Sequence, residues 1–255
     1  MLTIDGKPYI DLDDHLPLDT LPHIDVIKGA IADSYDLITA NTWQQNCLQD
    51  GSAYNCTWYA EEKTAKSKRD FFELELKNDL VAPYWILNLT ENHDRIVYDS
   101  LDCPEEKWDQ ITLKDIPDSW APMLKWIDDL TCFVKRGRIC ALLTRPGLAP
   151  QFHRDTGIPG HLKNIKPHRE EFIWFNITKD KSFVILDEED NNKIIPITSQ
   201  SAFFNHSQLH GADHSPAYWQ ISFNIEGSFT EEFRKQIGVD HIERYHYENV
   251  SESTE

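Results

Sequence analysis

Short apolar segments separated by turn residues fill the chain from Arg138 onward. Apolar and polar residues alternate within several of them, which is typical of half-buried strands. The segments are RICALLT, EEFIWFNIT, SFVIL, KIIPIT, SAFF and AYWQISFNIEG. DEEDNN, between SFVIL and KIIPIT, suits a hairpin turn. Six or seven short strands at this spacing predict an antiparallel barrel or sandwich.

Helical spacing of apolar residues occurs outside this strand-rich zone. The clearest helix is predicted over 117–133, where Pro122 falls in the first turn and Asp118 or Ser119 could cap the helix. Its apolar face would consist of Trp120, Met123, Leu124, Trp126, Ile127 and Leu130. The spacing also predicts helices over 25–40 and 229–237.

The chain shows no repeat and no linker, so we expect one domain. Residues 1–137 would form a helical and mixed support region, and residues 138–228 a β-rich catalytic zone. Residues 229–255 would add a short helix and an acidic tail.

Composition and charge exclude several classes of protein. Lys and Arg number 25 against 43 Asp and Glu, a net charge of −18, which argues against binding nucleic acid or anionic membranes. Five cysteines without CxxC spacing argue against a zinc site or a disulfide framework and favour structural thiols. The sequence shows no signal peptide and no apolar stretch of about 18 residues, so we expect a cytoplasmic protein.

The candidate chemistry lies in the stretch QFHRDTG, where His153 and Asp155 are two residues apart. Residues i and i+2 of a strand share a face, so the imidazole and the carboxylate would point the same way. A histidine from another strand would complete the two-histidine, one-carboxylate triad of non-haem Fe(II) oxygenases. A second such pair, His23 and Asp25, lies in a loop-like stretch, and we interpret it as a turn.

Three histidines in FFNHSQLHGADHS are candidates for the third ligand: His206, His210 and His214. We favour His210, because a His-Gly step after a short strand could place the side chain at a barrel rim. His206 is the alternative ligand, and otherwise it would contact the substrate or pack as an ordinary polar residue.

The stretch LLTRPGLAPQFHRDTG resembles the opening of the catalytic barrel in Fe(II)/2-oxoglutarate-dependent oxygenases. It is most similar to the aspartyl/asparaginyl β-hydroxylase-like branch, where a Pro-Gly turn precedes the first metal-binding histidine. FIWFNIT, the acidic hairpin, SAFFN, LHG and QISFNIEG follow in that family's order, so the resemblance covers about residues 138–228. It implies an α+β fold: a double-stranded β-helix, that is, a jelly-roll or cupin-like barrel, with a helical N-terminal portion.

The resemblance also implies an activity. His153, Asp155 and His210 would hold Fe(II), 2-oxoglutarate would be oxidised to succinate and CO2, and an amino-acid side chain, free or in a peptide, would be hydroxylated. The acidic surface weakly favours a basic substrate.

One position departs from the family pattern. Many relatives carry an Arg roughly ten residues beyond the distal histidine, where it pairs with the distal carboxylate of 2-oxoglutarate. Here that neighbourhood holds Gln220, Ser222 and Asn224, which alternate with apolar residues and so share one face.

A buried dicarboxylate still needs a cation or several hydrogen-bond donors. Arg169 lies where related enzymes place a basic residue after His-x-Asp, and it could bind a carboxylate bidentately. Arg145, just before the Pro-Gly turn, and Lys193 are alternatives. The competing interpretation of Arg169 is a surface salt bridge with Glu170 or Glu171.

Two other functions fit the same residues. A cupin-type metal-dependent hydrolase or isomerase would use the same ligands with zinc or manganese and no oxo-acid. A non-catalytic barrel that binds a small molecule or a partner would leave the metal site vestigial, and the missing Arg keeps this hypothesis open. Trp174 and Trp219 are interpreted as core or pocket wall.

Overall fold

The computed structural model describes residues 7–34, 39–47, 54–61, 84–90, 115–144, 152, 171–178, 182–187, 190, 193–204, 208–212 and 217–239. Eight strands form one antiparallel sheet in the order β1-β9-β6-β11-β5-β4-β2-β3. They are β1 (Tyr9–Asp11), β2 (Thr39–Cys47), β3 (Tyr54–Glu61), β4 (Tyr84–Asn88), β5 (Phe133–Thr144), β6 (Glu171–Asn176), β9 (Ser201–Phe204) and β11 (Gln220–Phe229). We call this the large sheet.

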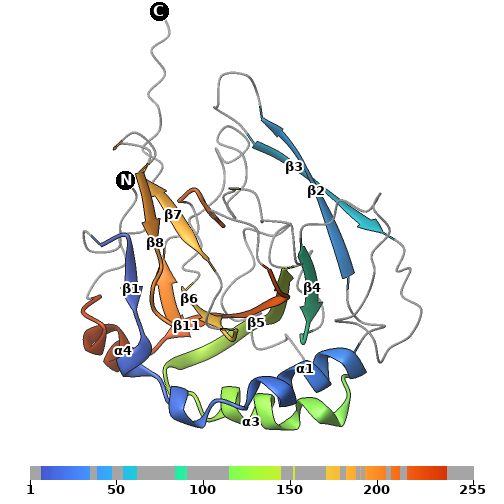
Figure 1. Cartoon of the computed structure of the whole chain (residues 1–255). Helices are drawn as coiled ribbons and strands as arrows, with labels where there is room; N and C mark the ends of the chain where they lie inside the picture. Colours follow the sequence, from blue (N-terminus) through green and yellow to red (C-terminus); the bar gives the residue numbers. More distant parts are fainter. Residues whose placement is uncertain are drawn as a thin grey trace, which may run out of the picture.

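A second antiparallel sheet, the small sheet, has the order β10-β7-β8. Its strands are β7 (Val184–Asp187), β8 (Lys193–Pro196) and β10 (His210–Gly211). Asp187 of β7 lies opposite Lys193 of β8 in the strand register, which confirms the hairpin turn predicted for DEEDNN. From β6 to β11 the chain passes repeatedly between the two sheets, and Figure 1 shows β7 and β8 on the opposite side of β6 and β11 from the helices.

The main helices lie on one face of the large sheet. They are α1 (Ile24–Asp33) and α3 (Ala121–Asp128), which run side by side in Figure 1. The other helices among the described residues are the 3-10 turns η1 (Asp13–His15), η2 (Leu18–Thr20) and η6 (Asp118–Trp120), and the short helix α4 (Glu231–Gln236). Among the described residues, no helix has the length and apolar character needed to cross a membrane.

Two tryptophans attach the helices to the sheet. Trp120 of η6 packs edge-on against Phe223 of β11, and Trp126 of α3 packs edge-on against Phe175 of β6. The Trp120 indole N–H also donates a hydrogen bond to Ser34 Oγ at 2.7 Å, which ties η6 to the end of α1. The predicted apolar face of 117–133 is confirmed: its other members are buried, and Leu124 packs half-buried against the core.

The sequence predicted the helices at the correct positions in the chain, but some of their predicted boundaries were wrong. The spacing predicted a helix over 25–40, but α1 ends at Asp33. Ala40, the predicted last residue of that helix, lies instead in β2, which begins at Thr39. Neither Asp118 nor Ser119 caps α3, because both belong to η6, which runs directly into α3. Pro122 does lie in the first turn of α3, where its missing N–H leaves no bond unmade.

The region before residue 138 contributes more strand than the sequence pattern indicated. β1 to β4 belong to this region and pair into the large sheet together with the strands of the β-rich zone. β5 begins at Phe133, before the expected boundary. The described part of the region therefore shares a sheet with the later strands.

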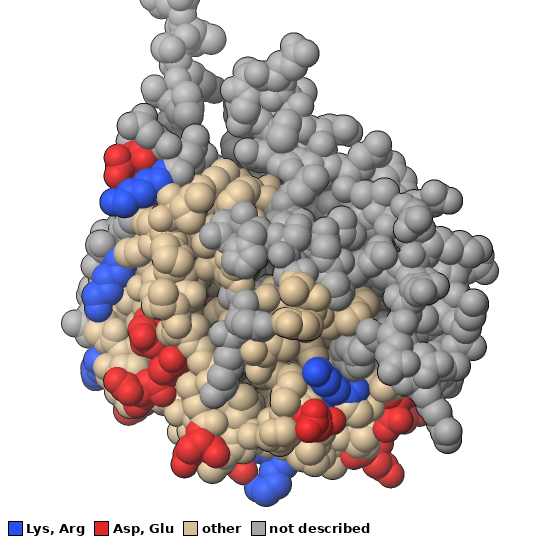
Figure 2. Space-filling model, viewed as in Figure 1, with Lys and Arg blue, Asp and Glu red and all other residues tan. Residues whose placement is uncertain are grey.

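The surface follows the acidic composition. On the face drawn in Figure 2, Asp and Glu side chains lie along the lower edge, where Figure 1 places the helices, with Lys and Arg between them. Lys125 donates to Asp129 at 2.7 Å, and this hydrogen bond raises the pKa of Lys125 above its ordinary value. Arg136 pairs with Asp128 on the same exposed surface.

One ion pair, by contrast, is buried and joins β6 to α4. Glu171 is 0% exposed, and its carboxylate accepts hydrogen bonds from the Arg234 guanidinium at 2.7 Å and from the Phe229 backbone N–H at 2.5 Å. Both carboxylate oxygens of Glu171 are therefore engaged inside the molecule.

Replacing Arg234 with Met should destabilise the fold by about 3 kcal/mol, because it leaves the Glu171 charge buried without its partner. The matched control is Arg136→Met, which removes an exposed pair and should cost less than about 1 kcal/mol. Urea unfolding of the two variants measures the difference, and equal losses would contradict a stabilising role for the buried pair.

Candidate active site

The central strands of the large sheet carry different side chains on their two faces. The face toward α1 and α3 is apolar, with Ile139, Ala141, Leu143, Ile173, Phe175, Ile221, Phe223 and Ile225 in register across β5, β11 and β6. The opposite face, toward the small sheet, carries Thr144, Asn176, Gln220, Ser222 and Asn224. We call this second set the polar face.

Four of the five side chains of the polar face are buried although they are polar, and Asn224 is half-buried. Ser222 is 0% exposed, Thr144 1%, and Asn176 and Gln220 4% each. The sequence alternation predicted that Gln220, Ser222 and Asn224 share a face, and the strand register confirms it. Burial of so many polar groups on one face costs free energy unless each finds a partner.

Three buried polar atoms on this side of the sheet have no hydrogen-bond partner among the described residues. They are Thr144 Oγ1, Asn224 Oδ1 and the indole nitrogen of Trp174, which is the cross-strand neighbour of Asn224. An unsatisfied buried donor or acceptor costs about 1–3 kcal/mol. These atoms therefore mark a place suited to a polar ligand.

Sequence reasoning missed Thr144 and Asn176 and assigned Trp174 only to core or pocket wall. The alternation along RICALLT and FIWFNIT carries the signal for these residues. It shows that each strand has two faces, but it does not say which face of one strand continues the polar face of another. That choice required the register of β5 and β6 against β11.

His210, on β10 of the small sheet, faces the same space. Its ring centroid lies 5.6 Å from that of Phe183 and 5.3 Å from that of Phe204. Phe183 in turn stacks on Trp174 with ring centroids 4.9 Å apart. His210 is 2% exposed, so its imidazole is buried between the two sheets.

A backbone hydrogen bond fixes the tautomer of His210. Its Nδ1 lies 2.8 Å from the carbonyl oxygen of Gln208. Because a carbonyl only accepts, Nδ1 carries the proton, and the lone pair of the neutral ring lies on Nε2. This second-nitrogen contact is typical of histidines that bind a metal, since it orients the ring.

Two segments far apart in the sequence meet beside His210. A Cβ atom added to Gly211 would lie 3.1 Å from the N, Cα and Cδ1 atoms of Phe152. A Cβ at that distance would be tighter than most real Cβ contacts, so glycine at this position lets the two backbones approach closely without a shift of Phe152. Phe152 immediately precedes His153, and Gly211 immediately follows His210.

Six predicted site residues lie outside the described residues: His153, Asp155, Arg145, Arg169, His206 and His214. Within the described part of the chain, no three His, Cys, Asp or Glu side chains gather as a metal-binding group. The alternative carboxylate-binding residue Lys193 is 65% exposed, and its amine is 3.5 Å from Asp190, so a role between the two sheets does not fit its position.

The second His-x-Asp pair has a structural role. His23 precedes α1, and its Nδ1 accepts a hydrogen bond from the Asp25 backbone N–H at 3.4 Å. Both side chains are largely exposed. The interpretation of this pair as a turn is confirmed, in the form of a helix cap.

The described thiols are structural. Cys132 and Cys140 are buried and make no disulfide. Burial raises the pKa of the Cys132 thiol to about 12. The thiol therefore stays protonated at neutral pH, unlike a nucleophile or a metal ligand.

The sequence matches no family model, and it matches no protein of curated function. Solved structures give weak matches. An oxidoreductase of the 2OG-Fe(II) oxygenase family from Burkholderia pseudomallei superposes with a TM-score of 0.36 at 9% identity, over 62% of this chain and 75% of that one. AviO1 from Streptomyces viridochromogenes Tue57 gives 0.30 at 12% identity, over 78% and 93%.

A prolyl hydroxylase from Trichoplax adhaerens, solved with a hypoxia inducible factor peptide fragment, gives a TM-score of 0.28 at 13% identity. That match covers 46% of this chain and 59% of the hydroxylase. All three scores are below 0.5, so a function for this chain has to be argued from its own residues.

Proposed function

We propose that this protein is an Fe(II)- and 2-oxoglutarate-dependent dioxygenase in which His153, Asp155 and His210 hold the iron. The contact between Phe152 and Gly211 carries the proposal. It joins the neighbours of the first and third predicted ligands, which are 57 positions apart in the sequence. The hydrogen bond from His210 Nδ1 to a backbone carbonyl supports the same assignment, because a contact of this kind orients the ring of a metal-binding histidine.

The strand order supports a double-stranded β-helix as the fold. In the large sheet β5 and β6 flank β11, and β9 follows β6, while β10, β7 and β8 make the small sheet. Phe152 lies between β5 and β6 in the sequence and packs against β10. A strand that begins there would extend the small sheet and present His153 and Asp155 on one face.

The polar face supplies donors for an oxo-acid. A carboxylate accepts several hydrogen bonds, and both the Thr144 hydroxyl and the Trp174 indole N–H can donate. We propose that they act with the residues predicted for this role, which are Arg169, Arg145, Gln220, Ser222 and Asn224. Burial of Thr144, Trp174, Gln220 and Ser222 would keep water away from the reacting groups.

Bound Fe(II) and 2-oxoglutarate would supply the electrons that reduce O2 at this site, with 2-oxoglutarate oxidised to succinate and CO2. The chain would hold both groups between the sheets, with His210 oriented from β10 and the polar donors lying on the large sheet opposite. We propose an amino-acid side chain, free or in a peptide, as the group that is hydroxylated.

Prepared without oxygen, the protein should show a visible charge-transfer band only when Fe(II) and 2-oxoglutarate are both added. In air the same mixture should release succinate. His153→Ala and His210→Ala should each abolish the band, because each removes a ligand, whereas His206→Ala should preserve it. Absorption spectroscopy measures the band.

The matched control is His23→Ala, which removes the histidine of the exposed His-x-Asp pair and should leave the band intact. Failure of the wild-type protein to give either band or succinate would contradict the oxygenase function. Loss of the band in His206→Ala but not in His210→Ala would show that the third ligand is His206 and not His210.

Gly211→Ala should weaken binding of Fe(II) by roughly tenfold or more, because the new methyl group pushes against the backbone of Phe152 beside the first ligand. Overpacking of this kind costs about 1–3 kcal/mol. Gly29→Ala is the control, since a Cβ there meets nothing within 4 Å and alanine favours its helix. Equal iron affinities, measured by titration without oxygen, would show that the contact does not set the metal site.

Trp174→Phe should lower 2-oxoglutarate affinity roughly tenfold, because a hydrogen bond to a charged group contributes about 1.5–3 kcal/mol. It should destabilise the ligand-free fold less than Trp120→Phe or Trp126→Phe, whose indoles donate to Ser34 and to the Pro17 carbonyl. Calorimetry of the manganese-loaded protein and urea unfolding check the two effects. An unchanged 2-oxoglutarate affinity in Trp174→Phe would show that Trp174 does not bind the oxo-acid.

A further inference from the structure

A buried glutamine lies directly beside the candidate iron ligand His210. Gln208 is 2% exposed, and neither its amide nitrogen nor its amide oxygen has a hydrogen-bond partner among the described residues. An unsatisfied buried donor or acceptor costs free energy, and this side chain leaves one of each. Turning the amide over would only exchange the two atoms, and both places would still lack a partner. The residues proposed to hold iron and 2-oxoglutarate do not include Gln208.

Backbone hydrogen bonds fix the position of Gln208 next to β10. Its carbonyl oxygen lies 2.8 Å from His210 Nδ1, and the Leu209 carbonyl accepts a hydrogen bond from the Leu186 N–H at 2.8 Å. The second bond continues the pairing of β10 with β7 by one residue. Residues two apart in a strand share a face, which favours the same side of the small sheet for Gln208 and His210. The unpartnered amide therefore belongs to the surroundings of the candidate iron site.

The oxo-acid alone does not satisfy this amide. At neutral pH 2-oxoglutarate carries two carboxylates and a keto group, all of which only accept hydrogen bonds. It could accept from the Gln208 amide nitrogen, but it offers no donor to the Gln208 amide oxygen. Asn224 Oδ1, on the polar face, is a second buried acceptor without a partner among the described residues. The space between the sheets therefore suits a further ligand group that donates as well as accepts.

An amide group matches Gln208 in shape and in polarity. A carboxamide carries an N–H and a C=O side by side, so it can form two parallel hydrogen bonds with the amide of a glutamine, one in each direction. The N–H and C=O of one residue in an extended peptide point the same way and can pair similarly. A site of this kind rejects an analogue without the N–H, because the buried oxygen is then left without a partner.

We propose that Gln208 is a specificity-determining residue that binds an amide group of the substrate through one hydrogen bond in each direction. Amide binding follows from Gln208 alone, whereas the assignment of the amide to the substrate rests on the proposed oxygenase function. Among the substrates proposed above, Gln208 favours those that present an amide beside the group to be hydroxylated. The amide is either a carboxamide or the main chain of a peptide.

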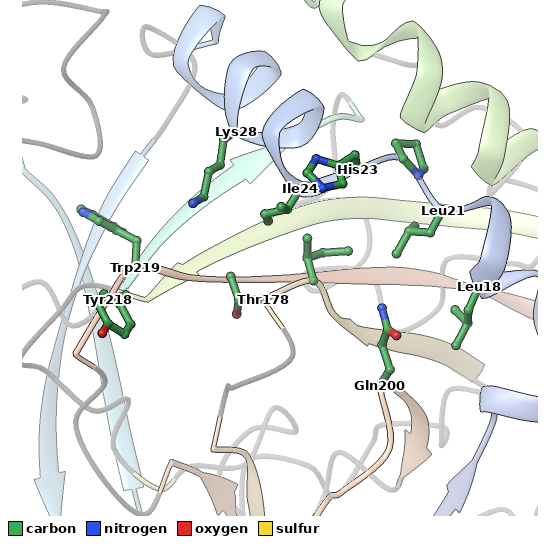
Figure 3. A pocket seen from close by; sticks show the side chains of 11 residues that line it. Leu18, Leu21, His23, Ile24, Lys28, Thr178, Gln200, Tyr218 and Trp219 are labelled. Atoms are coloured by element: carbon green, nitrogen blue, oxygen red, sulfur yellow. The ribbon is translucent and has the colours of Figure 1, made fainter.

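A second glutamine lines a separate cavity and provides a matched control. A pocket of about 480 Å³ lies where β6 ends and β11 begins, between these strand ends and the segment from η2 to the start of α1 (Figure 3). Gln200 lines this pocket together with apolar residues such as Leu21 and Ile24, whereas Gln208 and His210 do not. An amide with an apolar body could bind there instead. The two glutamines are therefore compared in the same experiment.

The binding test uses three probes with the same apolar chain on the full chain without iron or oxo-acid. Hexanamide has a donor and an acceptor, whereas N,N-dimethylhexanamide and hexanoate have no N–H. Hexanamide should bind at least about tenfold more tightly than either, because only hexanamide satisfies both atoms of Gln208. Titration by saturation-transfer NMR measures the affinities.

A second pair of probes distinguishes a carboxamide from a peptide main chain. N-acetylglycine N-methylamide presents main-chain N–H groups, and N-acetylsarcosine N,N-dimethylamide lacks them. A preference for the N–H form in this pair but not among the hexanoyl probes assigns the amide to a peptide main chain. The reverse result assigns it to a carboxamide.

Gln208→Met should bring the preferred amide to within about threefold of its N-methylated analogue, because methionine keeps the length of glutamine but loses both strong hydrogen-bonding groups. Gln200→Met should keep the preference of the wild-type protein. Equal binding within both sets of probes, or a preference that survives in Gln208→Met, would overturn the proposal. Loss of the preference in Gln200→Met alone would place the amide in the pocket of Figure 3 and would overturn it as well.

Unfolding in urea distinguishes a ligand-binding amide from a structural one. Because the Gln208 amide has no partner to lose, Gln208→Met should leave the urea midpoint of the ligand-free protein unchanged or raise it. Ser34→Ala removes a buried hydroxyl that bonds to Ala30 and Trp120, and it should lower the midpoint. An equal fall in Gln208→Met would show that the amide is already paired, for example through an ordered water, and that the proposal is wrong.

A further arm tests whether the amide belongs to the substrate. Mn(II) replaces iron, its binding is followed by EPR, and the NMR lines of the preferred amide are recorded with 2-oxoglutarate present. The lines nearest the amide should broaden most, and Gln208→Met should abolish the broadening. Binding of the amide without broadening, while Mn(II) is bound, would overturn the assignment to the substrate. Failure of Mn(II) to bind would contradict the oxygenase function and this assignment, whereas amide binding is decided by the metal-free test.

Discussion

The structure depends on the burial of both faces of β11. One face is apolar and packs against the helical layer, where Trp120 of η6 contacts Phe223 of β11. The other face is polar and also largely buried, with Ser222 at 0% and Gln220 at 4% exposure and Asn224 half-buried. A strand of this kind needs a second layer on its polar side and hydrogen-bond partners within that layer. The small sheet provides the layer, and the proposed oxo-acid would provide partners.

The same constraint explains why the candidate metal ligand comes from the small sheet. His210 reaches the enclosed space from β10, where Phe183 and Phe204 pack around its ring. The Gln208 carbonyl fixes the ring orientation. Gly211 then allows the Phe152 backbone to lie against β10, so that the iron site would form where the two sheets meet.

The charges on the outer surface differ from those in the interior, and the net charge of the chain does not reveal this difference. Acidic side chains lie on the outer surface around the helices (Figure 2), while Glu171 is neutralised inside by Arg234. Net charge therefore described the outer surface of the protein and gave no guide to the charges inside it.

The sequence by itself determined the local elements, because apolar spacing and alternation act within a segment. It predicted α3 with its apolar face, the β7–β8 hairpin, and the shared face of Gln220, Ser222 and Asn224. It also singled out His210 on the strength of a His-Gly step, and the role of His210 as a ligand stays a prediction. The predicted cap of α3 and the predicted end of α1 were wrong, because neighbouring contacts rather than helix propensity set where these helices begin and end.

Only the tertiary structure decided which faces meet. The register of β5 and β6 against β11 placed Thr144 and Trp174 beside Asn224, and the crossing between sheets placed Phe152 against Gly211. Likewise, the pairing of Glu171 with Arg234 joins residues distant in the sequence. Periodicity defines two faces for each strand, but the partner of each face depends on how distant strands pair, and a one-residue change of register would exchange the faces.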